Sequence, residues 1–320
     1  MTVVMEMAKL AVSANFVNSG LRGRGIQSGV ALIQVLLITT IISLLAIRFT
    51  DTARNQIDIA SKFEDRIRAQ FRARSVINEL LFTELADSIE PVSTAQRESA
   101  DFLNYTKKIN YWGESFTWGK DVTISIQDLN GLAPHRYPDH PVWRRLLINQ
   151  GLRFEDINRY LGEFSDIQDP DTRSWIFGDI EPRRTSSGKA YLNGYAQSDM
   201  VLRWVFSDNP PLLHTLLDFS HVRAPFRMNI LHSPNQLIQA LFEAETASLI
   251  IAARNNNAQS TLQLDQLLTA DFTPESTNRY SSSQKKITVF AKVGDTIWHE
   301  TNILKISSRA KIPFSVVSGG

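Results

Sequence analysis

A single uninterrupted apolar run, beginning at residue 30, is the strongest pattern along the chain. Residues 30–47, about eighteen positions, contain no Asp, Glu, Lys or Arg, which matches the length of a membrane-crossing helix. At a rise of about 1.5 Å per residue this helix would be roughly 27 Å long, against a bilayer core of about 30 Å. The pattern therefore predicts a transmembrane helix over residues 30–47.

The residues before this run indicate its orientation and its processing. Lys9, Arg22 and Arg24 precede the run, so the positive-inside rule keeps this end in the cytoplasm and places everything after Arg48 across the membrane. A secretory signal has its small residues after the apolar region, whereas Gly29 stands before it. That order predicts cleavage in front of the run, and an uncleaved signal anchor is the alternative.

The helical pattern continues beyond the membrane run. Apolar residues recur at every fourth position in Ile59, Phe63, Ile67 and Phe71. Further apolar positions extend this face at Ile77, Leu80, Leu81 and Leu85. Neither Gly nor Pro interrupts residues 30–90, and Pro91 ends the pattern. One long helix is the simplest interpretation, with a membrane part over residues 30–47 and an external part over residues 48–90.

Alternation of apolar and polar residues predicts strands in two regions that are far apart in the chain. Residues 121–129 have a period of two and lead into Asn130-Gly131, a pair typical of turns. Near the C-terminus, residues 287–293 repeat the alternation, and residues 303–306 and 314–317 offer further strands. Between the two strand regions the period is helical. The predicted helices cover residues 141–150, 154–164, 199–206, 211–219, 234–242 and 244–254.

Strand, then many helices, then strands predicts an α+β fold in which helices are inserted into a small sheet. The sheet would come from residues 110–131 and 280–318, and the inserted all-α domain from residues 132–275. The length of 320 residues, with 43% hydrophobic residues, is enough to bury such a core.

Charge and cysteine content exclude several classes of site. The chain has 34 basic and 33 acidic residues, a net charge of +1, so no global field favours nucleic acid or an acidic substrate. It has no cysteine, which excludes disulfides, thiol nucleophiles and Cys-ligated zinc.

An acidic run at residues 166–171 is the first candidate for a ligand site. It carries Asp166, Asp169 and Asp171 around Pro170, and clustered carboxylates of this kind suit calcium, which takes six to eight oxygen ligands at about 2.3–2.6 Å. Asp179 and Glu181 lie close enough in sequence to help. The run lacks the spacing of an EF-hand loop, so a solvated turn after a helix is the alternative.

A second candidate is the pair of helices that follows residue 233. Ser233 with Pro234 predicts an N-cap followed by proline at the first helical position, and the segment resembles a helix-hairpin-helix. Its hairpin, residues 242–245, has no glycine and carries Glu243 and Glu245, whose charges would repel phosphate. A structural hairpin is therefore preferred to the alternative, a membrane-tethered helix-hairpin-helix nucleic-acid-binding protein.

No catalytic motif accompanies these features. The histidines are scattered over positions His135, His140, His214, His221, His232 and His299. None has the spacing of a zinc protease or stands beside a nucleophile elbow, and the chain contains no phosphate-binding glycine loop. The sequence therefore predicts a protein that is not an enzyme, and a membrane-anchored hydrolase is the weakest of the three interpretations.

Several segments, in their order, resemble a known family. Gly29-Val30-Ala31-Leu32-Ile33, followed by Val35-Leu36-Leu37-Ile38, resembles the processing site and membrane helix of type IV pilin-like proteins. Further segments of the resemblance are residues 124–131, 166–171, 192–194 with 201–205, 228–230 and the C-terminal strands. With them, nearly everything from Gly29 onward resembles the minor pseudopilins called type II secretion system protein K (general secretion pathway protein K).

This resemblance implies how the N-terminus is processed. Residues 1–29 would be a leader that a prepilin peptidase removes after Gly29, leaving Val30 as a methylated N-terminus, with Gly25 as the second candidate for cleavage. Most pilins carry glutamate at the fifth mature position, which this family lacks, and here that position is Gln34. A subunit without this carboxylate fits the tip of a pseudopilus.

The resemblance also implies partners and location. The family fold is a long N-terminal membrane-spanning helix packed on a small antiparallel pilin-like sheet, with a large inserted all-α domain. Such a protein sits in the inner membrane with its C-terminal domain in the periplasm, and it works with prepilin peptidase and the inner-membrane secretion platform. It caps the pseudopilus in a heterotrimer with other minor pseudopilins and binds no nucleic acid. Helix packing there would use Ile59, Phe63, Ile67 and Phe71.

The resemblance also implies that the chain belongs with proteins that can bind calcium near an Asp-Pro-Asp segment. The resemblance carries Asp166, Asp169 and Asp171 over to this chain as metal ligands. A second acidic stretch of the family is replaced by residues 188–191, where Lys189 stands in place of carboxylates.

Overall fold

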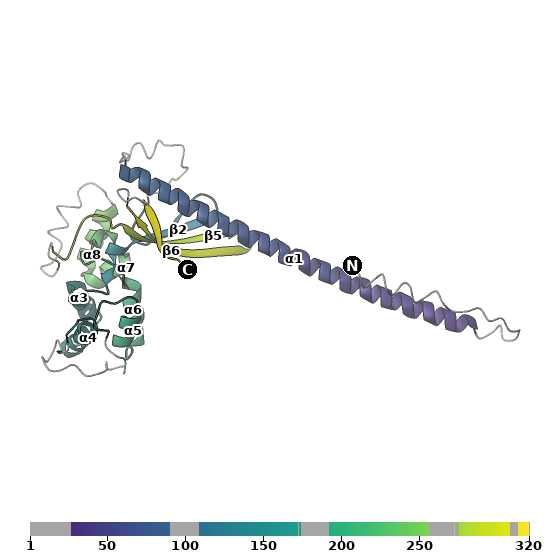
Figure 1. The fold of residues 1–320 in the computed structure, drawn as a ribbon, viewed down its shortest axis with the longest axis horizontal. Helices are drawn as coiled ribbons and strands as arrows, with labels where there is room; N and C mark the ends of the chain where they lie inside the picture. Colours follow the sequence, from purple (N-terminus) through teal and green to yellow (C-terminus); the bar gives the residue numbers. More distant parts are fainter. Residues whose placement is uncertain are drawn as a thin grey trace. The chain divides into compact units, whose positions relative to one another are not determined.

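The fold is α+β, with a long apolar N-terminal helix, a small antiparallel sheet and further helices (Figure 1), as the sequence predicted. A computed structural model describes residues 27–89, 109–171, 173, 192–255, 272, 275–307 and 313–319. The chain divides into two compact units, Met1–Phe63 and Glu64–Gly320.

Helix α1 (Gln27–Ile89) confirms the prediction of one uninterrupted helix. Its apolar part, from Val30 onward, is long and apolar enough to cross a membrane, and none of that apolar stretch is buried. Polar side chains in this part satisfy their hydrogen bonds on the helix itself. Thr40 Oγ1 donates to Leu36 O over 2.7 Å and Ser43 Oγ to Thr39 O over 2.8 Å, which reduces the cost of placing hydroxyls in an apolar medium.

The sheet has five antiparallel strands in the order β1-β2-β5-β6-β7. Its strands are β1 (Phe116–Thr117), β2 (Val122–Asp128), β5 (Gln284–Val293), β6 (Thr296–Ile306) and β7 (Phe314–Gly319). Burial alternates along β2 and β5, because one face of the sheet packs on α1 and the other faces solvent. The four predicted strands are confirmed, and β6 begins well before the predicted residue 303.

One face of α1 packs on the sheet within the second unit. Its buried residues are Ala69, Ala73, Val76, Ile77, Leu80 and Leu81. All of them except Ala69 share a hydrophobic cluster with Ile124, Ile126, Ile287, Val289, Leu304 and Ile306 of the strands. The two alanines carry no bulk beyond Cβ, so the helix backbone lies close to the sheet there.

The apolar positions of α1 therefore form two faces, and the single continuous face expected from the sequence is wrong. Ile59, Phe63 and Phe71 are exposed and Ile67 is partly buried, whereas Ile77 belongs to the buried face. At 3.6 residues per turn each step of four residues rotates the side chain by about 40°, so a stripe spaced by fours turns away from the sheet.

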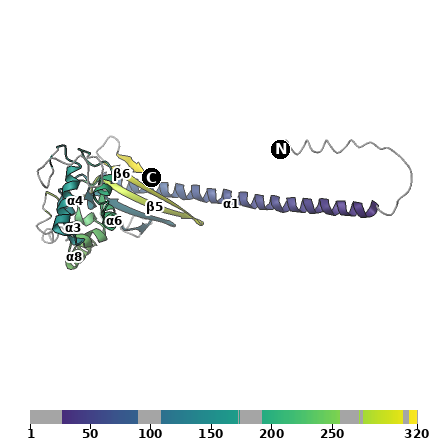
Figure 2. The same ribbon diagram turned by 90° about the horizontal axis from the view of Figure 1, so that it is seen from below.

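The helices between β2 and β5 have a hydrophobic core of their own. They are α3 (Pro141–Asn149), α4 (Phe154–Asp166), α5 (Met200–Val205), α6 (Pro210–Phe219), α7 (Asn235–Leu241) and α8 (Ala244–Asn255). All six predicted helices are confirmed, and both views show α3, α4, α6 and α8 gathered in one group (Figures 1 and 2). Trp143, Phe164 and Phe206 are fully buried among them. The limits of the inserted domain, residues 132–275, stay a prediction.

Local capping explains why these helices begin where they do. His140 Nδ1 accepts a hydrogen bond from Val142 N, with Pro141 at the first turn of α3. Asn209 caps α6 in the same way, with proline following. The predicted N-cap at Ser233 is wrong by one position, because Pro234 occupies the cap of α7 and supplies no side-chain hydrogen bond.

The Asn130-Gly131 pair ends β2 in a tight turn, as expected, but the turn is not that of a hairpin. After β2 the chain enters a short 3-10 helix, η1 (Leu129–Gly131), and leads on to the helices. A Cβ on Gly131 would overlap the main-chain carbonyl oxygen of His232. Glycine is therefore required at this position because the two backbones approach each other closely.

Candidate functional site

An exposed aromatic row on α1 is the surface most suited to binding another helix. Phe71 and Phe82 are 69% and 70% exposed, and eleven residues, about three helical turns, separate them. They point away from the face that packs on the sheet. Earlier on the helix, Ile59 and Phe63 are exposed as well. Two largely exposed phenylalanines on one helix face indicate an interaction surface.

A buried ion pair fixes which face of α1 points outward. Glu84 Oε2 lies 3.2 Å from Lys285 Nζ of β5, and both side chains are nearly buried. Tyr111 Oη donates a hydrogen bond to Glu84 Oε1 over 2.5 Å, and the Lys285 ammonium lies 5.2 Å from the Tyr111 ring centroid. Rotating the helix would separate these buried charges, so the pair sets the rotation of α1 on the sheet.

Arginines along the same helix bind the rim of the sheet. Arg72 Nη1 lies 3.6 Å from Asp121 Oδ2. The Arg66 guanidinium lies 5.5 Å from the centroid of Trp298. Such exposed contacts contribute little energy each. Both contacts link α1 to residues of the sheet region.

The end of β2 holds a buried carboxylate that connects the sheet to the helices. Asp128 is fully buried, and its carboxylate accepts hydrogen bonds from Ser281 Oγ over 2.5 Å and from Ser282 N over 2.9 Å. His232, in the short helix η2 (Ile230–His232), places Nδ1 2.9 Å from Asp128 Oδ2. Burial raises the pKa of Asp128, but the hydrogen bonds from His232, Ser281 and Ser282 outweigh burial, and the pKa lies below its usual value.

This arrangement does not have the connectivity of a hydrolase. Ser281 donates to Oδ2 of Asp128, the same oxygen that His232 contacts. A nucleophilic serine would instead donate to the second imidazole nitrogen, so that the histidine lies between serine and carboxylate. The Asp128 cluster therefore acts as a structural junction. This cluster was not predicted from the sequence, because His232 and Asp128 lie far apart in the chain and no local pattern pairs them.

The other buried histidines also serve the fold. His135 Nε2 lies 2.7 Å from Ser220 Oγ, where β3 (Ala133–Pro134) and β4 (Ser220–His221) pair in parallel. Burial, with a smaller contribution from nearby His221, lowers the pKa of His135 to about 3. Burial likewise lowers the pKa of His221 to about 4. Both imidazoles are thus neutral at pH 7.

The acidic run does not bring its three carboxylates together. Asp166 is buried at the end of α4, whereas Asp171 is exposed and accepts a hydrogen bond at Oδ1 from Arg173 N over 2.7 Å. Burial, together with the charges of Asp171 and Asp166, raises the pKa of Asp169. Within the described residues, no group of three or more His, Cys, Asp or Glu side chains is placed to hold a metal ion. Asp179 and Glu181 lie outside the described residues.

One atom of this run still suits a cation. Oδ1 of Asp169 is buried and has no hydrogen-bond partner among the described residues. An unpartnered carboxylate oxygen is a suitable calcium ligand, but one such atom is far from a complete set. Calcium binding by Asp166, Asp169 and Asp171 therefore remains a prediction.

The processing and membrane residues lie at the start of α1. Gly29 and Val30 are in its first turn, and Gln34 follows one turn later with its side chain exposed. Gly25 lies outside the described residues. Cleavage at Gly29 and the role of Gln34 remain predictions.

The helical hairpin is confirmed in α7 and α8, which residues 242 and 243 connect. Phe242 is buried there against Phe272, with ring centroids 5.5 Å apart. Glu243 and Glu245 are exposed, so the hairpin presents negative charge where a phosphate-binding hairpin presents free amides.

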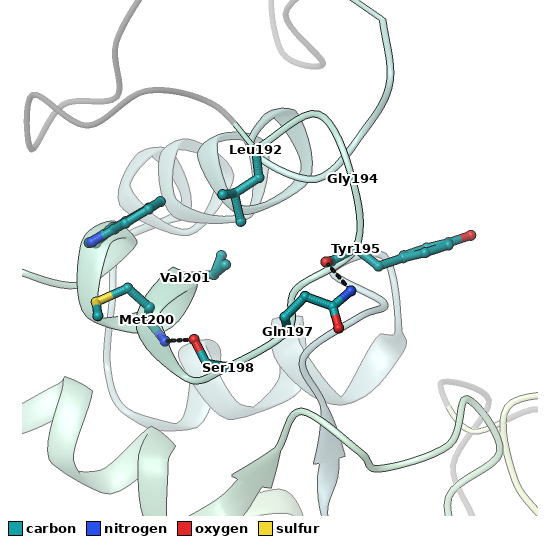
Figure 3. A pocket seen from close by; sticks show the side chains of 8 residues that line it. Leu192, Gly194, Tyr195, Gln197, Ser198, Met200 and Val201 are labelled. Carbon is teal, nitrogen blue, oxygen red and sulfur yellow. Dashed lines mark hydrogen bonds between the residues drawn. The ribbon is translucent and has the colours of Figure 1, made fainter.

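A pocket of about 380 Å³ lies beside α5 (Figure 3). Its lining residues are Leu192, Gly194, Tyr195, Gln197, Ser198, Met200, Val201 and Trp204. Ser198 Oγ accepts a hydrogen bond from Met200 N, and Gln197 Nε2 donates to Tyr195 O. The lining mixes polar and apolar side chains and includes no charged residue.

Comparison with known proteins gives matches among solved structures only. No protein-family model matches the chain, and no curated protein sequence is similar to it. In structure it is similar to a chain in the crystal structure of the GspK-GspI-GspJ complex from the type 2 secretion system of enterotoxigenic Escherichia coli. The identity is 14%, the TM-score is 0.40, and the match covers 78% of this chain and 98% of that chain.

Proposed function

We propose that this chain is a minor pseudopilin of a type II secretion system, a subunit that caps the tip of the periplasmic pseudopilus and supports protein export. One observation carries the proposal. The N-terminal part of helix α1 is exposed, apolar and long enough to cross a membrane. The C-terminal part of the same helix packs one face on a small antiparallel sheet. A subunit that is stored in the membrane and then packed into a filament by the same helix needs both parts.

The exposed residues of α1 would form the contact with neighbouring subunits. The predicted stripe consists of Ile59, Phe63, Ile67 and Phe71, and Phe82 is a further exposed phenylalanine of α1. None of these three phenylalanines packs in the core of this chain. Burying a phenylalanine side chain contributes about 1.5–3 kcal/mol, so a helix from another subunit would gain substantially by covering them.

Gln34 supports a place at the tip. A carboxylate at this depth of the bilayer is costly unless a neighbouring group neutralises it. The amide of Gln34 needs no such neighbour, so the subunit does not depend on the amine of a preceding one. The helices α3 to α8 add bulk that the body of a filament would not accommodate, which favours the tip as well.

Processing and location follow from the same proposal. A prepilin peptidase would cut after Gly29, with Gly25 as the alternative, and leave Val30 as the methylated N-terminus. The mature protein would be an inner-membrane protein with a single span, its sheet and helices in the periplasm, delivered to the filament by the inner-membrane platform. The protein would carry out no catalytic step.

Complex formation with other minor pseudopilins tests the proposal. The soluble part, residues 50–320, is mixed with soluble domains of the candidate subunits from the same organism and analysed by size-exclusion chromatography with light scattering. A ternary complex is expected, and absence of any complex would contradict the proposal.

A substitution on the exposed face of α1 tests which surface makes the contact. Phe71→Glu should weaken the ternary complex by about tenfold or more, as for a central interface residue. Phe154→Glu, a matched control on α4 at 67% exposure, should leave it unchanged.

A further inference from the structure

Strand β7 forms one edge of the sheet that the described residues make. It pairs with β6 on one side, and among the described residues no strand pairs with the other. Its residues, Phe314 to Gly319, include no charged residue and no proline. Natural edge strands are protected by lysine, proline, bulges or a covering element, because unpaired backbone groups recruit other strands. The one irregularity of β7 comes after Val316, so residues 314–316 remain regular.

The hydrogen-bond pattern shows which backbone groups face outward. Ser307 N donates to the carbonyl oxygen of Pro313 over 2.8 Å, so Pro313 directs its carbonyl toward β6. In an antiparallel ladder, successive residues direct their backbone groups to opposite sides. The N–H and C=O groups of Phe314 and Val316 therefore point away from β6, toward the open edge. These groups can be satisfied by an extended backbone.

The side chains of the same two residues extend the core face of the sheet. Phe314 pairs with Ile306 and Val316 with Leu304, and both partners on β6 are buried in the cluster under α1. Yet Phe314 is 42% and Val316 61% exposed, because the cover provided by α1 ends at β6. A strand added beside β7 would shield both side chains with its own cross-strand neighbours.

We propose that β7 is a docking edge for a strand of a neighbouring pilin-like subunit, which extends the sheet to six strands. The inference rests on the proposed function, and it adds a second contact to the one made by α1. The partner segment is extended and carries apolar residues at alternate positions, so that they lie on the face of Phe314 and Val316.

The length of β7 favours a neighbour in the assembly over a second copy in solution. A specific, stable interface buries about 1,200–2,000 Å² in total, more than a single added strand beside this six-residue strand provides. Within a filament, helix packing holds subunits together at a high effective concentration, at which a small second contact forms readily. Strand addition is therefore expected in the assembled complex and not in the free protein.

Single-cysteine cross-linking in the complete chain tests this, because the natural sequence has no cysteine to interfere. Single cysteines are first placed along the edge strands of candidate partner subunits. The Val316→Cys variant is then expressed together with these subunits of its own secretion system, and the cells are treated with a short bismaleimide. The expected result is an adduct with a different pilin-like subunit. Tyr280→Cys, at a more exposed position away from the edge, should give none.

The same experiment separates this inference from the proposed function. Phe63→Cys on α1 reports assembly through the helix. Adducts from Phe63→Cys without any from Val316→Cys would overturn strand docking and leave the proposed function standing. An adduct of two copies of this chain through Val316→Cys would overturn the assignment of the partner. If neither Phe63→Cys nor Val316→Cys gives an adduct, both proposals are overturned.

Substitutions at Val316 test the backbone contact itself. Val316→Pro removes the outward N–H but no hydrogen bond to β6, and Val316→Lys places a charge on the edge. Each should lower the yield of the Phe314→Cys adduct by about fivefold, the effect of one net hydrogen bond. Val316→Thr keeps the N–H and should retain the yield. Unchanged yields in both the Pro and Lys variants, with thermal unfolding like that of the natural protein, would contradict the inference.

Discussion

The imidazole of His232 donates a hydrogen bond from Nδ1 to Oδ2 of Asp128 over 2.9 Å, and 104 residues of chain separate the two. The contact joins the end of strand β2 to the helices that follow it. Ser281 and Ser282 complete the set of donors from the chain that returns to β5. The junction between sheet and helices is therefore built on one buried, ionised carboxylate.

Removing His232 should destabilise the fold. His232→Ala leaves Asp128 buried with one donor fewer, and losing the partner of a buried charge costs about 3 kcal/mol. Urea unfolding followed by circular dichroism measures the change. His214→Ala, whose side chain is 82% exposed, is the control and should change stability by less than about 0.5 kcal/mol. Equal stability of the two variants would contradict the role of the junction.

Stability should also fall on mild acidification. The pKa of His135 in the folded state is about 3, well below its value of 6.5 when exposed, so unfolding takes up a proton as the pH falls below 6.5. The free energy of unfolding should then drop by about 1.4 kcal/mol per pH unit for this group between pH 6.5 and pH 4. The pKa of Asp128 is lowered in the folded state, so its contribution to the free energy of unfolding is lost only when the pH falls below its unfolded pKa of 3.8.

The variant His135→Gln isolates this effect. It retains a polar side chain but cannot be protonated in this range. Unfolding curves measured from pH 7.5 to pH 4 should show a shallower dependence on pH in the variant. If the slopes are the same, the buried neutral state of His135 is not the cause.

Substitutions of Glu84 and Lys285 should have strongly non-additive effects on the free energy of unfolding. Glu84→Gln leaves the buried ammonium of Lys285 without its counter-charge and should cost about 3 kcal/mol. The double variant Glu84→Leu with Lys285→Met replaces both charges by apolar groups and should recover most of that loss. A double-mutant cycle from denaturant unfolding gives the coupling, and simple additivity would argue against a buried pair that holds α1 in place.

Much of this fold could be predicted from local signals. The helix boundaries near Pro141 and Pro210 were predictable because a proline and a capping side chain mark them within a few residues. The first half of β6 was missed because polar residues such as His299 and Glu300 stand on both faces there. The site was harder to predict, because the contact of Glu84 with Lys285 joins segments that lie far apart in the chain.

Asp169 provides a test of the calcium prediction. Burial and the charges of Asp171 and Asp166 raise its pKa, so the ionised group is unfavourable in the folded state once the pH exceeds the unfolded value of 3.8. Without added cation, Asp169→Asn should therefore stabilise the protein slightly at pH 7. If the run binds calcium, millimolar calcium should raise the melting temperature of the natural protein and not of the variant. A calcium response that is equal in both would exclude Asp169 as a ligand.

The most direct test of the central claim is the N-terminus of the mature protein. The chain is produced in cells that have, or lack, a prepilin peptidase, and the N-terminal peptide is identified by mass spectrometry. A methylated Val30 is expected as the first residue when the peptidase is present, and an uncleaved leader when it is absent. An intact residue 1 in both would contradict the assignment as a pseudopilin.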